Sequence, residues 1–104
     1  MYQTTMYFGR AIPDGGSVSA ADFRTFTDEI IAPIFTAGYT VQRAVGGWCD
    51  TATGQSIRED SVLVTLIHDG AMRNLIRAVA DAYKSRFRQD AVMVVTQPVE
   101  VEFI

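Results

Sequence analysis

The sequence is poor in the side chains that carry covalent and metal chemistry, with one cysteine and one histidine among 104 residues. A single cysteine, Cys49, cannot form a disulfide within the chain, which fits a reducing compartment. Structural zinc sites need a full set of nitrogen and sulfur ligands, which this chain lacks. Cys49 as a nucleophile would need a base such as His68 beside it. We therefore expect no metal, no cofactor and no catalytic dyad.

Positive charge is also scarce, since 9 Lys and Arg oppose 12 Asp and Glu. Nucleic-acid-binding surfaces are usually basic, so we expect no nucleic-acid partner. No apolar run is long enough to span a bilayer, and the N-terminus lacks the pattern of a leader peptide. A cytoplasmic location without membrane contact is expected, with the envelope or secretion as the alternative if a leader has been removed.

The size and composition predict a single globular domain over residues 1–104 with its own hydrophobic core. Hydrophobic residues make up 48% of the chain and charged residues 20%. Eight of the nine basic residues are arginine, which reflects either base composition or anion recognition by the planar guanidinium group.

The spacing of apolar residues predicts four strands and two helices. The first helix should begin after an N-cap at Ser19, with Asp22 as its capping-box partner, and Pro33 should end or kink it. Asp69 and Gly70 should open the second helix. Strands are expected at Tyr2–Phe8, Tyr39–Val45, Val62–Ile67 and Ala91–Val95, the last of which could resume over Val99–Phe103 after Pro98.

This β-α-β-β-α-β order predicts an α+β, ferredoxin-like fold. Right-handed crossovers then give a four-stranded antiparallel sheet of order 4-1-3-2 with both helices on one face. The other face keeps apolar side chains, and exposed apolar faces usually mark interfaces. We therefore expect the chain to form a homodimer or higher oligomer.

The stretch from Val45 to Ser61 holds the only Trp and the only Cys. Its glycines and polar residues predict an elaborated hairpin loop between two strands, and long connections of this kind are often functional. The predicted topology places this loop at one end, together with the segment after the first strand and the turn before the last. His68 should lie at the opposite end.

A candidate ligand site follows from the polar residues gathered at that end. Two arginines could grip an anion with forked hydrogen bonds, a nearby glutamate could orient one of them, and the Trp could stack on a ring. The alternative is a structural arginine–glutamate network with a Trp that packs within the loop. The candidate ligand-binding residues are Arg10, Trp48, Asp50, Arg58, Glu59 and Gln89.

Several short motifs occur in a fixed order along nearly the whole chain. They read FGR at 8–10, DG at 14–15, VS at 18–19, GxW at 46–48, TG at 53–54, RExS at 58–61 and YKxRFxQ at 83–89. In these the chain resembles an uncharacterised family of small bacterial, often lipoprotein-like, domains of unknown function. The resemblance supports the fold and implies no activity.

These observations favour a non-enzymatic, homo-oligomeric module that binds or sequesters a small anionic or nucleotide-like ligand at the loop end. One alternative is a protein–protein interaction domain that uses the apolar face or the long loop. Another, by fold analogy alone, is a dimeric α+β barrel-type isomerase or monooxygenase.

Overall fold

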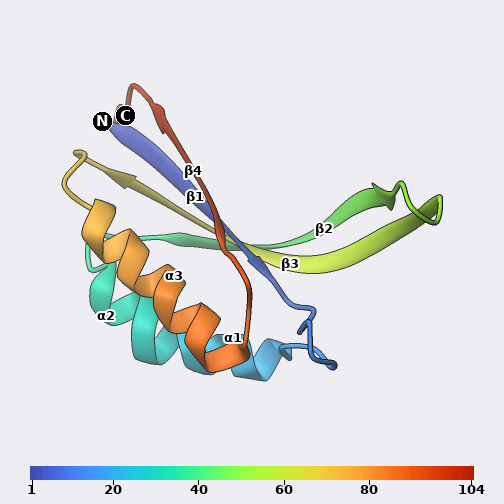
Figure 1. The fold of residues 1–104 in the computed structure, drawn as a ribbon. Coiled ribbons are helices and arrows are strands. Elements are labelled where there is room, and N and C mark those ends of the chain that lie inside the picture. Colours follow the sequence, from blue (N-terminus) through green and yellow to red (C-terminus); the bar gives the residue numbers. More distant parts are fainter.

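A computed structural model describes residues 1–104 and shows an α+β fold (Figure 1). The four strands form one antiparallel sheet of order β2-β3-β1-β4, which is the predicted order read in reverse. The helices lie together on one side of this sheet. The elements are β1 (Tyr2–Gly9), α1 (Ala20–Phe26), η1 (Thr27–Ile31), α2 (Ala32–Ile34), β2 (Thr40–Asp50), β3 (Gln55–His68), α3 (Arg73–Phe87) and β4 (Met93–Pro98).

The core lies between the helices and the two central strands. Side chains alternate between the faces of a strand, so Met6 and Phe8 of β1 face the helices together with Val64 of β3. Phe8 packs edge to face against Tyr83 of α3, with 4.8 Å between the ring centroids. Aromatic contacts of this kind add stability beyond the area that they bury.

The first helix begins as predicted but changes its pitch midway. The Ser19 hydroxyl accepts a hydrogen bond from the Asp22 N–H, and the Asp22 carboxylate accepts one from the Ser19 N–H, so the capping box is confirmed. The π-helical turn η1 then shifts the buried position by one residue. The regular helical spacing of Phe23, Phe26 and Thr27 predicts Ile30 as the next residue of the buried face, but Ile31 is the fully buried one. The wider turn ends two residues before Pro33, whose ring and missing N–H disturb a regular helix.

The predicted long loop is wrong, because most of it is regular strand. β2 and β3 pair without interruption from Thr40 opposite Thr65 to Asp50 opposite Gln55, and only Thr51–Gly54 turns the chain. Asp50 organises this turn, since its carbonyl oxygen accepts from the Gly54 N–H at 2.7 Å. The exposed stretch lacks the hydrophobic alternation that identifies a strand with one buried face.

This hairpin projects beyond the rest of the sheet (Figure 1). β1 pairs with β3 only as far as Gly9 opposite Ser61, so residues 45–60, which we call the arm, have no third strand beside them. The radius of gyration is 14.8 Å, whereas a compact domain of this length has about 13 Å. The accessible surface is 6958 Å², whereas a compact monomer of 11.5 kDa exposes about 5800 Å².

Two further predictions need correction. The spacing of Met72, Leu75, Ile76, Val79 and Tyr83 predicts that these residues form the buried face of the second helix. Ile76, Val79 and Tyr83 are buried, together with Ala80, whereas Leu75 is exposed. The last strand begins at Met93 and ends at Pro98, and no regular strand follows over residues 99–103. Pro98 has no N–H for further strand pairing.

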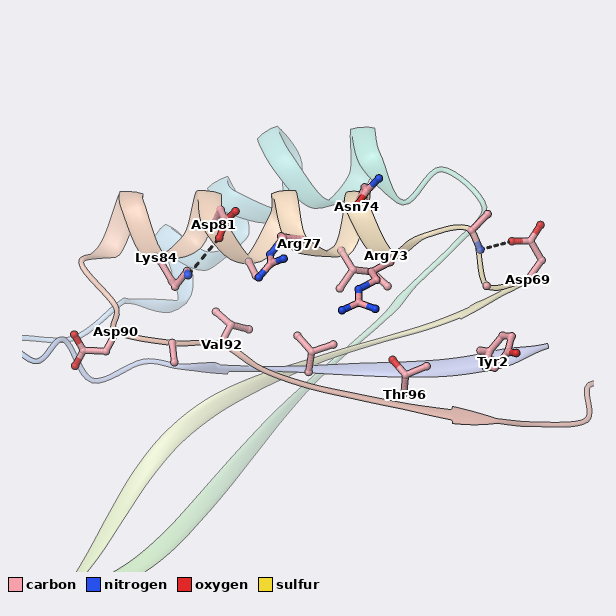
Figure 2. A pocket seen from close by; sticks show the side chains of 16 residues that line it. Tyr2, Asp69, Arg73, Asn74, Arg77, Asp81, Lys84, Asp90, Val92 and Thr96 are labelled. Atoms are coloured by element: carbon pink, nitrogen blue, oxygen red, sulfur yellow. Dashed lines mark hydrogen bonds and ion pairs between the residues drawn. The ribbon is translucent and has the colours of Figure 1, made fainter.

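The edge strand β4 is only partly covered by the helices. Val94 is 41% exposed, whereas its cross-strand neighbour Met6 is fully buried. A groove of about 960 Å³ lies between α3 and β4 (Figure 2). On the opposite, helix-free face, which we call the open face, Met93 and Val95 are exposed, as the sequence predicted for that side of the sheet.

Candidate functional site

The topology brings the predicted loop segments to one end of the molecule, as expected. The Arg10 N–H donates to the Asp60 carbonyl oxygen at 3.0 Å, which joins the end of β1 to the base of the arm. The Gln89 side chain donates to the Ala11 carbonyl oxygen at 2.9 Å. His68 pairs with Tyr2 at the other end of the sheet.

The arm separates the predicted ligand-binding residues onto two faces. Arg58 lies opposite Gly47, on the side of the sheet that carries the helices. Trp48 and Glu59 lie on the open-face side. Glu59 forms no ion pair with Arg10 or Arg58. Within one protomer, Arg58, Glu59 and Trp48 therefore do not form a common site.

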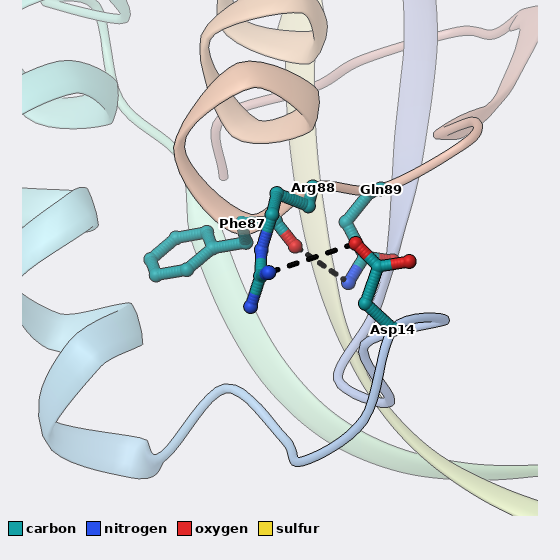
Figure 3. Close-up of polar contacts among 4 residues, drawn as sticks. All are labelled: Asp14, Phe87, Arg88 and Gln89. Carbon is teal, nitrogen blue, oxygen red and sulfur yellow. Dashed lines mark hydrogen bonds and ion pairs between the residues drawn. The ribbon is translucent and has the colours of Figure 1, made fainter.

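Gln89 and Asp50 have structural roles at this end. Figure 3 shows Gln89 and Arg88 at the end of α3, where Arg88 adopts a left-handed conformation and pairs with Asp14 at 3.6 Å. Together with the bond from Gln89 to Ala11, this contact fixes the segment after β1. The Asp50 carboxylate accepts from the Ala52 N–H at 2.9 Å and stabilises the tip of the arm.

Arg10 lies in a small pocket at the base of the arm, between α1 and the sheet. Its Nε donates to the Val18 carbonyl oxygen at 2.8 Å, which leaves the terminal nitrogens free to contact a ligand. Two arginines that the sequence analysis did not select join it there, Arg24 from α1 and Arg43 from β2. The pocket has a volume of about 240 Å³ and is lined by Arg10, Ala20, Phe23, Arg24, Thr27, Val41, Arg43 and Val62.

The positive charges of this arginine pocket are not paired within the chain. None of its eight lining residues is acidic, and none of its three arginines forms an ion pair. Asp60, the nearest acidic residue along β3, lies on the same side of the sheet but forms no ion pair either. Three guanidinium groups on low-polarity walls form an environment that favours an anion.

The pocket also coincides with the irregular turn of the first helix. Thr27, which lines the pocket, is the first residue of η1, and its hydroxyl donates to the Phe23 carbonyl oxygen at 2.9 Å. Single π-helical turns are frequent at functional sites. Arg43 could have been found from the sequence, because the period of two places it on the same strand face as Val41 and Val45. Arg24 could not, because it falls among the polar residues of its helix.

The chain offers no preformed metal centre, since no three His, Cys, Asp or Glu side chains are grouped to hold an ion. Cys49 is exposed on the arm. No helix combines the length and the hydrophobicity needed to cross a bilayer.

Comparisons with solved structures support the fold. A phage SAM lyase in complex with S-methyl-5'-thioadenosine superposes with a TM-score of 0.64 at 16% identity, over 92% of this chain and 79% of the lyase. CutA1 from Pyrococcus horikoshii OT3 superposes with a TM-score of 0.56 at 9% identity, over 99% of this chain and 87% of that chain. At these identities the similarity shows a shared fold alone.

The comparisons of sequence point to one family. Among curated proteins there is no match. A family model described as a protein of unknown function, DUF3574, matches residues 3–103. This confirms the resemblance that the motifs indicated: the chain belongs to the DUF3574 family.

Proposed function

We propose that this protein is a homo-oligomeric module that binds a small anionic, nucleotide-like ligand in the arginine pocket at the base of the arm. The observation that carries the proposal is the convergence of Arg10, Arg24 and Arg43 in one pocket without an acidic partner. These arginines come from the segment after β1, from α1 and from β2, so the folded chain holds the positive groups together despite their mutual repulsion. A bound anion would relieve that repulsion.

The shape of the pocket suggests how a ligand would lie. A volume of about 240 Å³ is suitable for a phosphate or carboxylate group, and Phe23 and Val62 supply an apolar wall. The arm continues from the pocket on the same side of the sheet, with Arg58 four residues beyond Val62, about 13 Å along the strand. A larger ligand could extend along the arm toward Arg58.

Self-association is the second part of the proposal. The accessible surface exceeds that of a compact monomer by about 1200 Å², more than the roughly 800 Å² that each partner buries in a standard interface. Trp48 and Val45 on the arm are 53% and 66% exposed. Covering such residues with a second copy would remove their apolar surface from water.

The fold neighbour that binds S-methyl-5'-thioadenosine suggests which compounds to test first. A nucleoside has a planar ring that could lie on apolar walls, and a nucleotide adds the phosphate that the arginines favour. Adenosine compounds with and without a phosphate therefore belong in the first screen.

Thermal-shift screening against nucleotides, sugar phosphates and carboxylates tests the proposal. A ligand at one hundred times its Kd stabilises the fold by about 2.7 kcal/mol, which should raise Tm by about 10 °C or more in a domain of this size. The Arg24→Gln/Arg43→Gln variant should lose this response. Its Tm without ligand should be little changed, because neither arginine has a partner in the structure.

The result that would contradict the proposal is a screen in which no anion stabilises the protein. Equal stabilisation of wild type and the variant would contradict the location of the site. Uncharged nucleosides that stabilise as well as nucleotides would show that the arginines are not the binding groups.

A further inference from the structure

The groove between α3 and β4 is a second concave surface, remote from the arginine pocket. Its volume of about 960 Å³ is large enough for a small organic molecule. Tyr2 and Asp69 line one end, and Asp90 and Val92 line the other. None of the six residues predicted from the sequence to bind a ligand contributes to it.

The floor of the groove is apolar. Val94 faces the helices beside Met6, but the helices cover Met6 completely and leave Val94 41% exposed. Ile76 and Ala80 of α3 line the same space from the other side. A bound molecule with an apolar part would cover the apolar surface that α3 leaves exposed. Removal of this surface from water would contribute to the binding free energy.

Two arginines of α3 extend into the middle of the groove, and neither forms an ion pair. Arg73 and Arg77 are four residues apart, on the same side of α3, and both project toward β4 (Figure 2). Neither makes an ion pair, and no side-chain hydrogen bond of either occurs within the chain. The third cation of the groove, Lys84, differs because it pairs with Asp81 at 3.3 Å.

A chain of hydrogen bonds through the buried Thr4 ends at the same place. The Gly70 N–H donates to His68 Nδ1 at 3.1 Å, so the ring hydrogen of the neutral imidazole lies on Nε2. Nε2 then donates to Thr4 Oγ1 at 2.7 Å. Thr96 Oγ1 lies 2.8 Å from Thr4 Oγ1, and either hydroxyl could donate in this pair; we take Thr4 as the donor, because Thr96 is then the acceptor available to its buried hydrogen. Thr4 is fully buried, whereas Thr96 lines the groove.

These hydrogen bonds orient the hydroxyl group of Thr96. With Thr4 as the donor, the Thr96 hydroxyl accepts this bond, and its own hydrogen is free to point toward a ligand in the groove. Polarisation along a chain of hydrogen bonds strengthens such a donor. Arg73, Arg77 and Thr96 thus have hydrogens without a partner inside the chain, and together they suit an acceptor that carries negative charge.

The acidic residues of the groove do not cancel this preference. Asp90 lies at the end opposite Tyr2, and Asp69 lies beyond Tyr2 at the other end (Figure 2). Asp81 lies one turn of α3 from Arg77 but pairs with Lys84 at 3.3 Å. The Asp69 carboxylate already accepts from the Ala71 N–H at 3.0 Å. Arg73 and Arg77 lie between these two acidic ends.

We infer that the groove is a second binding site, which takes a small organic anion with a carboxylate or phosphate group. Arg73, Arg77 and the Thr96 hydroxyl hold the acidic group, and the apolar part of the molecule lies on Ile76, Val92 and Val94. The inference is independent of the arginine pocket, because the two sites share no residue.

Titration with three probes, followed by amide NMR shifts, tests this inference. Benzoate and phenyl phosphate carry an apolar ring with either acidic group, and inorganic phosphate carries the anion alone. We expect saturable shifts at residues 73–77 and 93–96 with at least one ring-bearing probe, and weaker binding of inorganic phosphate. The preferred ring-bearing probe distinguishes a carboxylate from a phosphate ligand.

Variants then assign the binding groups. Arg73→Gln/Arg77→Gln should weaken binding by about tenfold or more, as expected for lost hydrogen bonds to a charged group. Thr96→Val should weaken it severalfold, and Thr96→Ser, which keeps the hydroxyl, should restore it. Arg24→Gln/Arg43→Gln should leave groove binding unchanged, and this separates failure here from failure of the arginine pocket.

Two results would overturn the inference. One is the absence of saturable shifts at the groove for all three probes up to about 10 mM, well above the millimolar affinity of a weak site. The other is unchanged binding in the Arg73→Gln/Arg77→Gln variant with its fold intact by NMR.

Discussion

The Tyr83 hydroxyl donates a hydrogen bond of 2.7 Å to the Gly9 carbonyl oxygen, across the core from α3 to the last residue of β1. Arg10 follows Gly9 directly, so this bond helps to fix the start of the segment that enters the arginine pocket. Burial raises the pKa of Tyr83 to about 12, although the positive charge of Arg10 acts in the opposite direction. The folded protein therefore keeps the phenol protonated.

The raised pKa predicts a specific pH dependence of stability. In the unfolded chain Tyr83 loses its proton near its ordinary pKa of 10.0, whereas in the folded protein it keeps the proton up to about 12. Over that range the folded state binds more protons, so the free energy of unfolding falls as pH rises. Below about pH 10 this contribution is complete and constant.

Urea unfolding of wild type and Tyr83→Phe between pH 8 and pH 12 measures this effect, a range chosen to bracket roughly the two pKa values. The variant should lose about 1 kcal/mol below pH 10 through the missing hydrogen bond. The difference between the two proteins should shrink at higher pH. A constant difference over the whole range would show that Tyr83 has no raised pKa.

The capping box of the first helix should make a measurable contribution to stability. Ser19→Ala removes the acceptor of the Asp22 N–H and should lower the free energy of unfolding by about 1 kcal/mol. Ser85→Ala is a matched control, because Ser85 is exposed on α3 and its hydroxyl has no partner. Equal stability of the two variants in urea would contradict the role of the cap.

The arm should determine the oligomeric state. Light scattering after gel filtration should give a mass that is a multiple of 11.5 kDa for wild type. Trp48→Asp should shift the population toward monomer, because the charge would have to be desolvated in the interface. Thr53→Asp at the tip of the arm adds the same charge outside the apolar part and should leave the mass unchanged. A monomeric wild type would exclude self-association through the arm.

The sequence was informative wherever one face of an element is buried. The alternation around Met6 and the apolar run around Val64 predicted two strands, and the spacing of Phe23, Phe26 and Tyr83 predicted two helices that cover them. Strand order then followed from chirality, and the structure confirms it. The arm was missed because neither of its faces is covered, so no pattern distinguishes its strands from a loop.

The candidate site could be predicted from the sequence only in part, for a different reason. Arg58 and Glu59 are neighbours in the sequence and suggested a joint site, but successive residues of a strand face opposite sides. Arg24 and Arg43 are far apart in the sequence and meet only because α1 packs beside β2. The groove depends on how far α3 extends over β4, which no local pattern of residues records.

The most direct test of the account is an NMR titration of AMP into the Arg73→Gln/Arg77→Gln variant, in which the groove is disabled. The account predicts saturable shifts of the Arg10, Arg24 and Arg43 amides and their loss when Arg24→Gln and Arg43→Gln are added. An AMP titration that leaves these three amides unmoved, or moves them equally without the arginine side chains, would contradict it.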